Sequence, residues 1–112
     1  DGIQVIVAEA TGANPKLMRQ FIDRLRRKVD AVAVLLAVKQ GESKVMLVAG
    51  VSSQLVGQGL HAGNWVISTA AVVGGGGGGR PDMAQAGGKL PEKLSEALES
   101  ARRTIAEQIQ DA

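Results

Sequence analysis

The chain has 112 residues, about the size of one domain, and its 45% hydrophobic and 21% charged residues are ordinary for a globular fold. The absence of cysteine excludes disulfide scaffolds and cysteine-based zinc sites, and one histidine cannot build a histidine-based metal site alone. The formal net charge of +2 permits nucleic-acid binding without requiring it.

The sequence offers little for catalysis or membrane insertion. There is no cysteine nucleophile, and no serine lies in a Gly-x-Ser-x-Gly setting. The longest apolar run, residues 31–38, is far shorter than the roughly 20 residues of a membrane-spanning helix. The first residues contain no basic stretch, so no signal peptide is expected. We therefore expect a single domain over residues 1–112 that is a binding module or part of a larger protein.

Residues 3–8 predict a short, buried strand, because they are mostly β-branched and place Ile3, Val5 and Val7 on one face. Asn14 and Pro15 then predict the start of a helix, as its N-cap and its first residue. The opposite faces of this helix are expected to be apolar and basic. The apolar face comprises Leu17, Met18, Phe21, Ile22, Leu25 and Val29.

Residues 31–38 form a continuous apolar run, which predicts a central strand buried on both faces. A turn should then return the chain as an antiparallel strand over residues 44–51. Further helices are expected over residues 62–72 and from Pro91 to about residue 110. The fold class is therefore α/β: a small mixed β-sheet, with a parallel crossover plus an antiparallel hairpin, packed with about three helices.

Six consecutive glycines at residues 74–79 are the least ordinary feature of the sequence. Each loses roughly 0.5–1 kcal/mol more than alanine would on ordering, yet a bare backbone can approach a ligand closely and turn its N–H groups toward an anion. Arg80 adds a guanidinium suited to phosphate, and Pro81 favours an extended backbone at Arg80. Neither a Walker loop nor a dinucleotide fingerprint surrounds the run. The two interpretations are a nucleic-acid backbone site and a mobile loop. The candidate RNA-binding residues are Gly77, Gly78, Gly79, Arg80, Gln85, Gly87, Gly88 and Lys89.

A second basic group lies on the first helix. It comprises Arg24, Arg26, Arg27 and Lys28, which are expected to form a solvated helix face, with RNA backbone contact as the alternative. Arg80 also has two interpretations, an RNA contact or a salt bridge inside the fold. His61 is expected at the surface or as a helix cap, and Trp65 in a packed core or interface, with base stacking as the alternative. No catalytic and no metal-binding residue is assigned.

Residues 77–88 resemble the signature of the DHHA1-type domain (C-Ala) found at the C-terminus of alanyl-tRNA synthetases; they read Gly-Gly-Gly-Arg-Pro-Asp-Met-Ala-Gln-Ala-Gly-Gly. The string Gly-Leu-His-Ala-Gly at residues 59–63 is similar to that family too. Two positions depart from it: Gly76 stands where lysine is common, and Trp65 where a smaller aliphatic residue is usual. The catalytic, tRNA-recognition and editing domains of such enzymes have no counterpart here, so the resemblance implies a C-terminal fragment of a larger synthetase.

The resemblance implies a function as well as a fold. It implies a non-catalytic domain that binds the outer corner of alanine-specific tRNA and supports aminoacylation with alanine and editing of mischarged tRNA. The parent is implied to be a cytoplasmic, ATP-dependent ligase that uses ATP, magnesium and zinc, while the fragment itself holds no cofactor. The implied partners are tRNA, the other domains of the parent and a second copy of it, and no membrane is expected. Two alternatives stay open, a nucleic-acid-binding domain of a DHH-family phosphodiesterase or exonuclease and an oligomerisation module. Arg80 stands where those nucleases carry histidine, which favours the synthetase.

Overall fold

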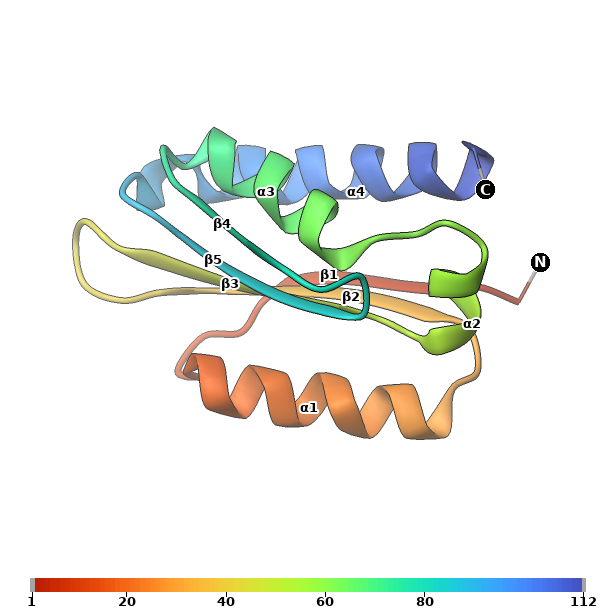
Figure 1. The fold of residues 1–112 in the computed structure, drawn as a ribbon. Coiled ribbons are helices and arrows are strands. Elements are labelled where there is room, and N and C mark those ends of the chain that lie inside the picture. The colour runs from red at the N-terminus through yellow and green to blue at the C-terminus, as the bar shows by residue number, and fades with distance from the viewer. Residues whose placement is uncertain (1, 112) are drawn as a thin grey trace.

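A sheet of five strands lies between one helix on one face and two helices on the other in the computed structural model, which describes residues 2–111 (Figure 1). The elements, in chain order, are β1 (Gln4–Glu9), α1 (Pro15–Lys28), β2 (Val32–Lys39), β3 (Val45–Val51), α2 (Ser53–Gly57), α3 (Ala62–Val72), β4 (Gly76–Gly79), β5 (Met83–Gly88), a 3₁₀ turn (Pro91–Lys93) and α4 (Leu94–Asp111). The expected α/β class is confirmed. The short helix α2 and the strands β4 and β5 were not among the expected elements.

The sheet is mixed and has the order β1-β2-β3-β5-β4. β1 and β2 are parallel because α1 connects them as a crossover, and all other neighbours in the sheet are antiparallel. β2 and β3 are buried along nearly their whole length, as a continuous apolar run predicts for a strand covered on both faces. The expected crossover and hairpin are both present.

Each face of the sheet has its own apolar core. α1 packs Met18 and Ile22 against β2 and β3 on one face. On the other face, α3 and α4 pack around Trp65, which is completely buried and donates its indole N–H to the Ala101 carbonyl oxygen at 2.9 Å. The packing interpretation of Trp65 is therefore confirmed, because a side chain with no exposed surface cannot stack on a base.

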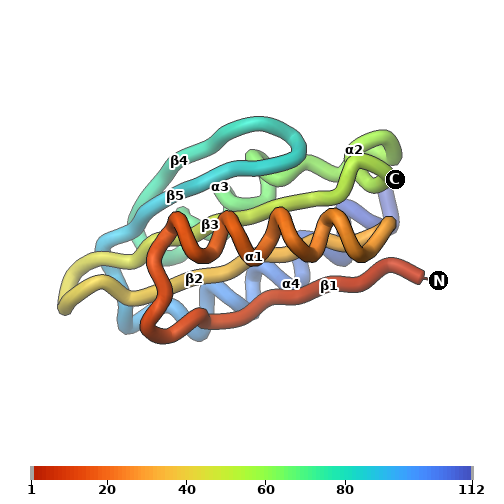
Figure 2. The backbone as a smooth tube through the Cα atoms, turned by 90° about the horizontal axis from the view of Figure 1, so that it is seen from below, coloured from red at the N-terminus to blue at the C-terminus, as the bar shows by residue number. Residues whose placement is uncertain are grey.

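α1 begins as expected: the Asn14 side chain accepts a hydrogen bond from the Leu17 N–H at 2.9 Å, and proline opens the helix. Only part of the expected apolar face is buried, since Leu17 and Phe21 are 51% and 44% exposed. α1 lies across β2 and β3 (Figure 2). Leu17 and Phe21 on its exposed flank line a groove of about 400 Å³, together with residues of β1. The prediction of a buried first strand is wrong, because β1 is an edge strand: none of its residues is fully buried, and Val5 is 41% exposed.

The glycine run contains a strand, β4, at the edge of the sheet, where it pairs with β5. This contradicts the interpretation as a mobile loop. A Cβ atom at Gly77 would lie 2.5 Å from the Ala86 Cα, and one at Gly79 would lie 2.8 Å from the Ala84 Cα. Both distances are too short for real side chains, so glycine lets β4 lie tightly against β5 beneath α3.

Candidate nucleic-acid interface

The β4–β5 hairpin gathers the candidate residues of the glycine segment into one structural unit. Gly77, Gly78 and Gly79 lie on β4, Arg80 follows it, Gln85, Gly87 and Gly88 lie on β5, and Lys89 comes directly after β5. The hairpin nevertheless has two separate ends, since a strand rises about 3.3 Å per residue and Arg80 is thus roughly 13 Å along the chain from Gly76. We call the end that contains Arg80 the hairpin tip.

At the hairpin tip, the side chain of Arg80 is 77% exposed. Its Nε lies 3.4 Å from a carboxylate oxygen of Asp82, and its backbone N–H donates to the Met83 carbonyl oxygen at 3.0 Å, which closes the turn. An ion pair this long and this exposed contributes little to stability. Arg80 therefore has a carboxylate partner and is also exposed enough to reach a ligand.

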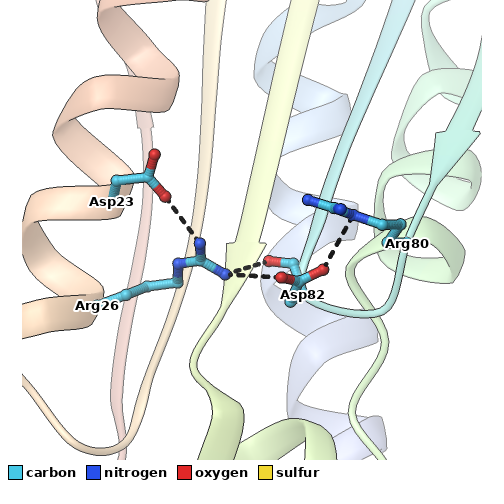
Figure 3. A network of polar contacts seen from close by, with 4 residues as sticks. All are labelled: Asp23, Arg26, Arg80 and Asp82. Carbon is cyan, nitrogen blue, oxygen red and sulfur yellow. Dashed lines mark hydrogen bonds and ion pairs between the residues drawn. The ribbon is translucent and has the colours of Figure 1, made fainter.

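A network of polar contacts from α1 holds the same tip (Figure 3). The Arg26 side chain is 22% exposed, and its Nη1 donates to the Asp82 backbone carbonyl at 3.0 Å and lies 3.4 Å from the Asp82 carboxylate. Its Nη2 donates to the Asp23 carboxylate at 2.7 Å. The Arg26 Nε is buried and has no hydrogen-bond partner within residues 2–111. The expectation of a solvated Arg26 is therefore wrong, because this side chain joins α1 to the hairpin tip.

Two turns earlier on the same flank of α1, Arg19 donates a hydrogen bond to the Gln85 side-chain oxygen. α1 thus supports the hairpin at two points, once through Gln85 on β5 and once at the tip. The remaining members of the basic group differ from Arg26. Arg24, Arg27 and Lys28 are exposed and form no ion pair within residues 2–111, so a solvated face and an RNA contact both remain open predictions for these three.

The other end of the hairpin contains a hollow of about 460 Å³. Ser43, Lys44, Lys89 and the four glycines at positions 75, 76, 87 and 88 line it, and we call it the glycine hollow. Ser43 and Lys44 come from the turn between β2 and β3 and are not among the predicted site residues. They lie beside the hairpin only because β3 pairs with β5, so no local pattern signals their position.

The two ends of the hairpin differ in charge. At the tip, the two arginines share the carboxylates of Asp23 and Asp82, so cations and anions balance. At the glycine hollow, Lys44 and Lys89 are exposed and form no ion pair within the described residues 2–111. The residues that line the hollow include no carboxylate. Within residues 2–111, the two lysines at the hollow therefore lack the carboxylate partners that the arginines at the tip have.

The N-terminal end of α3 packs against the β4–β5 hairpin. The His61 Nδ1 accepts a hydrogen bond from the Asn64 N–H at 3.0 Å, which confirms the capping role. A Cβ atom at Gly63 would lie 2.9 Å from the Gly79 carbonyl oxygen, so glycine at this position lets α3 pack closely on β4.

Within residues 2–111, no helix is both long and apolar enough to cross a membrane. In the same part of the chain, no group of three or more histidine, aspartate or glutamate side chains is placed to hold a metal ion.

Residues 2–107 of this chain, which include the whole hairpin, match the DHHA1 domain. The chain belongs to the DHHA1 domain family. The fold of this DHHA1 domain is similar to the crystal structure of the C-Ala domain from Aquifex aeolicus alanyl-tRNA synthetase. The TM-score is 0.77 at 31% sequence identity, and the match covers 88% of this chain and 87% of that chain. The resemblance indicated by residues 77–88 is thereby confirmed.

Alanine–tRNA ligases from several bacteria contain a related segment. The ligase of Rhodopirellula baltica is 55% identical over 105 residues, which is 94% of this chain and 11% of that ligase. The ligase of Bacillus subtilis is 48% identical over 100 residues, which is 89% of this chain and 11% of that ligase. This DHHA1 domain therefore spans about 11% of the length of these relatives.

Proposed function

We propose that this DHHA1 domain binds the outer corner of alanine-specific tRNA as part of an alanine–tRNA ligase and performs no chemistry itself. The observation that carries the proposal is the likeness, over 88% of the chain, to the C-Ala domain of an alanyl-tRNA synthetase. The parent ligase would be cytoplasmic and would join alanine to tRNA with ATP. Its magnesium and zinc would be held by other domains. This domain would hold one tRNA for both aminoacylation and editing.

The RNA would meet the β4–β5 hairpin mainly through its phosphates. An A-form helix hides its base edges in a deep groove, whereas the corner formed by stacked loops offers backbone and splayed bases. The hairpin supplies a bare edge strand together with the exposed side chains of Arg80 and Lys89. A domain with a net charge of +2 neutralises few phosphates, so weak binding with a modest salt dependence is expected.

Filter binding to alanine-specific tRNA and to a simple RNA hairpin, at several salt concentrations, tests the proposal. We expect tighter binding to the tRNA and an affinity that falls with salt, because each phosphate contact releases counterions. Equal affinity for both RNAs would argue against recognition of the corner. Indifference to salt would argue against phosphate contact.

Arg80 provides a test at the level of one residue. Arg80→Ala should weaken tRNA binding by about 1–3 kcal/mol, and Arg80→Lys should recover only part of this loss, because an ammonium lacks the bidentate fork. Arg27→Ala is the matched control, since Arg27 is exposed and should change the affinity much less. Arg26 cannot serve as the control, because its loss would release the hairpin tip. A lower melting temperature with unchanged affinity would make Arg80 a structural residue.

The alternative assignments predict different results for the isolated domain. We expect no alanine-dependent ATP–pyrophosphate exchange and no hydrolysis of mischarged tRNA above a buffer blank. A domain of a DHH-family phosphodiesterase or exonuclease would prefer single-stranded ends to folded tRNA. An oligomerisation module would show a mass that rises with concentration in sedimentation, without RNA binding.

A further inference from the structure

The flank of α1 that lies on the side of β1, which we call the outer flank, combines an apolar half with a basic half. Four side chains at helical spacing form one stripe along it: Leu17, Phe21, Arg24 and Lys28. Leu17 and Phe21 are 51% and 44% exposed, and the two cations are exposed without an ion pair in residues 2–111. The single carboxylate of α1, Asp23, pairs with Arg26 on the opposite flank. Apolar surface and basic side chains therefore lie next to each other on the outer flank.

β1 forms the edge of the sheet beside this flank (Figure 2). An edge strand presents a row of backbone N–H and C=O groups with which another strand can pair, and proteins commonly protect such edges with proline, lysine or a bulge. β1 reads Gln-Val-Ile-Val-Ala-Glu, which contains neither proline nor lysine, and its register with β2 is continuous. The outer edge of β1 is therefore suited to the addition of a strand.

The hydrogen bonds of β1 show which backbone groups point outward. The N–H groups of Gln4 and Ala10 donate to carbonyl oxygens in or next to β2, so the even-numbered residues of this segment face β2. Because these groups alternate along a strand, the N–H groups of Val5 and Val7 point away from the sheet. The Val7 carbonyl accepts a hydrogen bond from Arg102 of α4 at 3.2 Å, which agrees with this direction. Arg102 is exposed, so a peptide group could take its place.

The groove of about 400 Å³ between β1 and the outer flank is lined by apolar residues alone, among them Ile6, Leu17 and Phe21. At the other end of the flank, Lys28 lines a second hollow together with Gln4, the first residue of β1. The surface beside β1 is therefore basic where the strand starts and apolar towards its end.

We infer that β1 and the outer flank dock one extended, acidic segment of the parent ligase that lies outside this domain. The segment pairs with β1 as an added strand, places apolar side chains in the groove over Leu17 and Phe21, and brings carboxylates to Arg24 and Lys28. In such strand addition, main-chain hydrogen bonds supply affinity, and alternate side chains supply specificity. The inference rests on the proposed place of this domain in an alanine–tRNA ligase, whose relatives extend far beyond the 11% of their length that it spans.

Charge and hydrophobicity select this occupant over two others. Two copies of this domain that paired symmetrically through antiparallel β1 strands would place the basic half of each flank against the apolar half of the other. An RNA would match the cations of the flank and leave the apolar groove without an apolar partner. An extended segment with apolar residues at one end and carboxylates at the other matches both halves.

Photo-crosslinking in the full-length parent ligase tests the docking site. Phe21→p-benzoylphenylalanine places the crosslinker in the groove, and the same change at Glu107, an exposed residue of α4, is the matched control. Mass spectrometry of the tryptic peptides should identify one acidic ligase segment outside this domain, crosslinked from position 21 and not from position 107. Arg24→Glu combined with Lys28→Glu should lower the yield roughly tenfold, because like charges repel. Arg103→Glu should leave it unchanged.

Hydrogen exchange measures the strand pairing itself. The amides of Val5 and Val7 should exchange roughly tenfold or more slowly in the ligase than in the isolated domain, because the added strand accepts their hydrogen bonds. Phe21→Glu should abolish this protection, whereas Ile67→Glu, which changes an exposed apolar residue of α3, should not. Melting temperatures of the two variants verify that both domains fold.

The outcomes separate the docking site from tRNA binding. A crosslink from position 21 to tRNA or to a second copy of this domain would overturn the inference, and so would the absence of any crosslink. Equal exchange of the β1 amides in the ligase and in the isolated domain would overturn it as well. Phe21→Glu should bind tRNA like the wild-type domain, and a loss of binding would assign the flank to the RNA site instead. If the wild-type domain shows no preference for tRNA over a simple hairpin while the expected crosslink forms, the proposed tRNA binding fails and the docking site stands.

Discussion

The consecutive residues Gly75, Gly76 and Gly77 should respond in opposite ways to the same change to alanine. Gly75→Ala would place a methyl group 2.5 Å from the Gly88 Cα, and Gly77→Ala would place one 2.5 Å from the Ala86 Cα. Both neighbours are backbone atoms of the paired strand β5, so they cannot move away without separating β4 from β5. Gly76→Ala meets no atom within 4 Å.

The magnitudes follow from packing and from chain entropy. Overpacking a tight site costs about 1–3 kcal/mol, so Gly75→Ala and Gly77→Ala should each lower the free energy of unfolding by that amount. Gly76→Ala should raise it by about 0.4–1 kcal/mol, because the unfolded chain loses freedom while the folded chain gains no strain. The free energy of unfolding of Gly76→Ala should therefore exceed that of Gly75→Ala or Gly77→Ala by roughly 1.5–4 kcal/mol, which corresponds to about 6–16 °C in Tm for a domain of this size.

Urea unfolding of the wild type and the three variants measures these differences. Far-UV circular dichroism and the fluorescence of Trp65, the single tryptophan, provide two probes of the same transition. If Gly75→Ala and Gly77→Ala are as stable as Gly76→Ala, β4 does not pair closely with β5 in solution, and the packing explanation of the glycine run is wrong. If Gly76→Ala is as unstable as its neighbours, position 76 is packed and does not border an open hollow.

The remaining predictions concern helix contacts. Arg26→Ala should lower the free energy of unfolding by about 1–2 kcal/mol and Arg27→Ala by less than about 0.5 kcal/mol, because only Arg26 contacts Asp82. Equal melting temperatures of the two variants would contradict this prediction. Trp65→Phe should destabilise by about 1–3 kcal/mol in calorimetry, because a buried carbonyl loses its indole donor. Asn14→Ala should lower the free energy of unfolding by about 1 kcal/mol because it removes the N-cap, whereas Asn14→Asp, which keeps the acceptor, should not.

Local patterns in the sequence determined much of the fold. The continuous apolar run identifies β2 as a strand with no solvent face, and such a strand belongs in the middle of a covered sheet. Asn14 and Pro15 determine where α1 begins, and the helix expected over residues 62–72 coincides with α3. Caps and apolar periodicity depend on residues within a turn or two of each other, so the sequence alone carries them.

The tertiary structure decided what the glycine run does and where the candidate site lies. Glycine is depleted in strands, and β4 is a strand because β5 pairs with it and α3 covers it. Charge pattern alone cannot distinguish Arg26 from Arg27, because the partner Asp82 lies 56 positions later in the chain. Lys44 likewise lies near Lys89 because β3 pairs with β5. Contacts between residues so far apart in the sequence depend on how the strands pair in space, which no local pattern specifies.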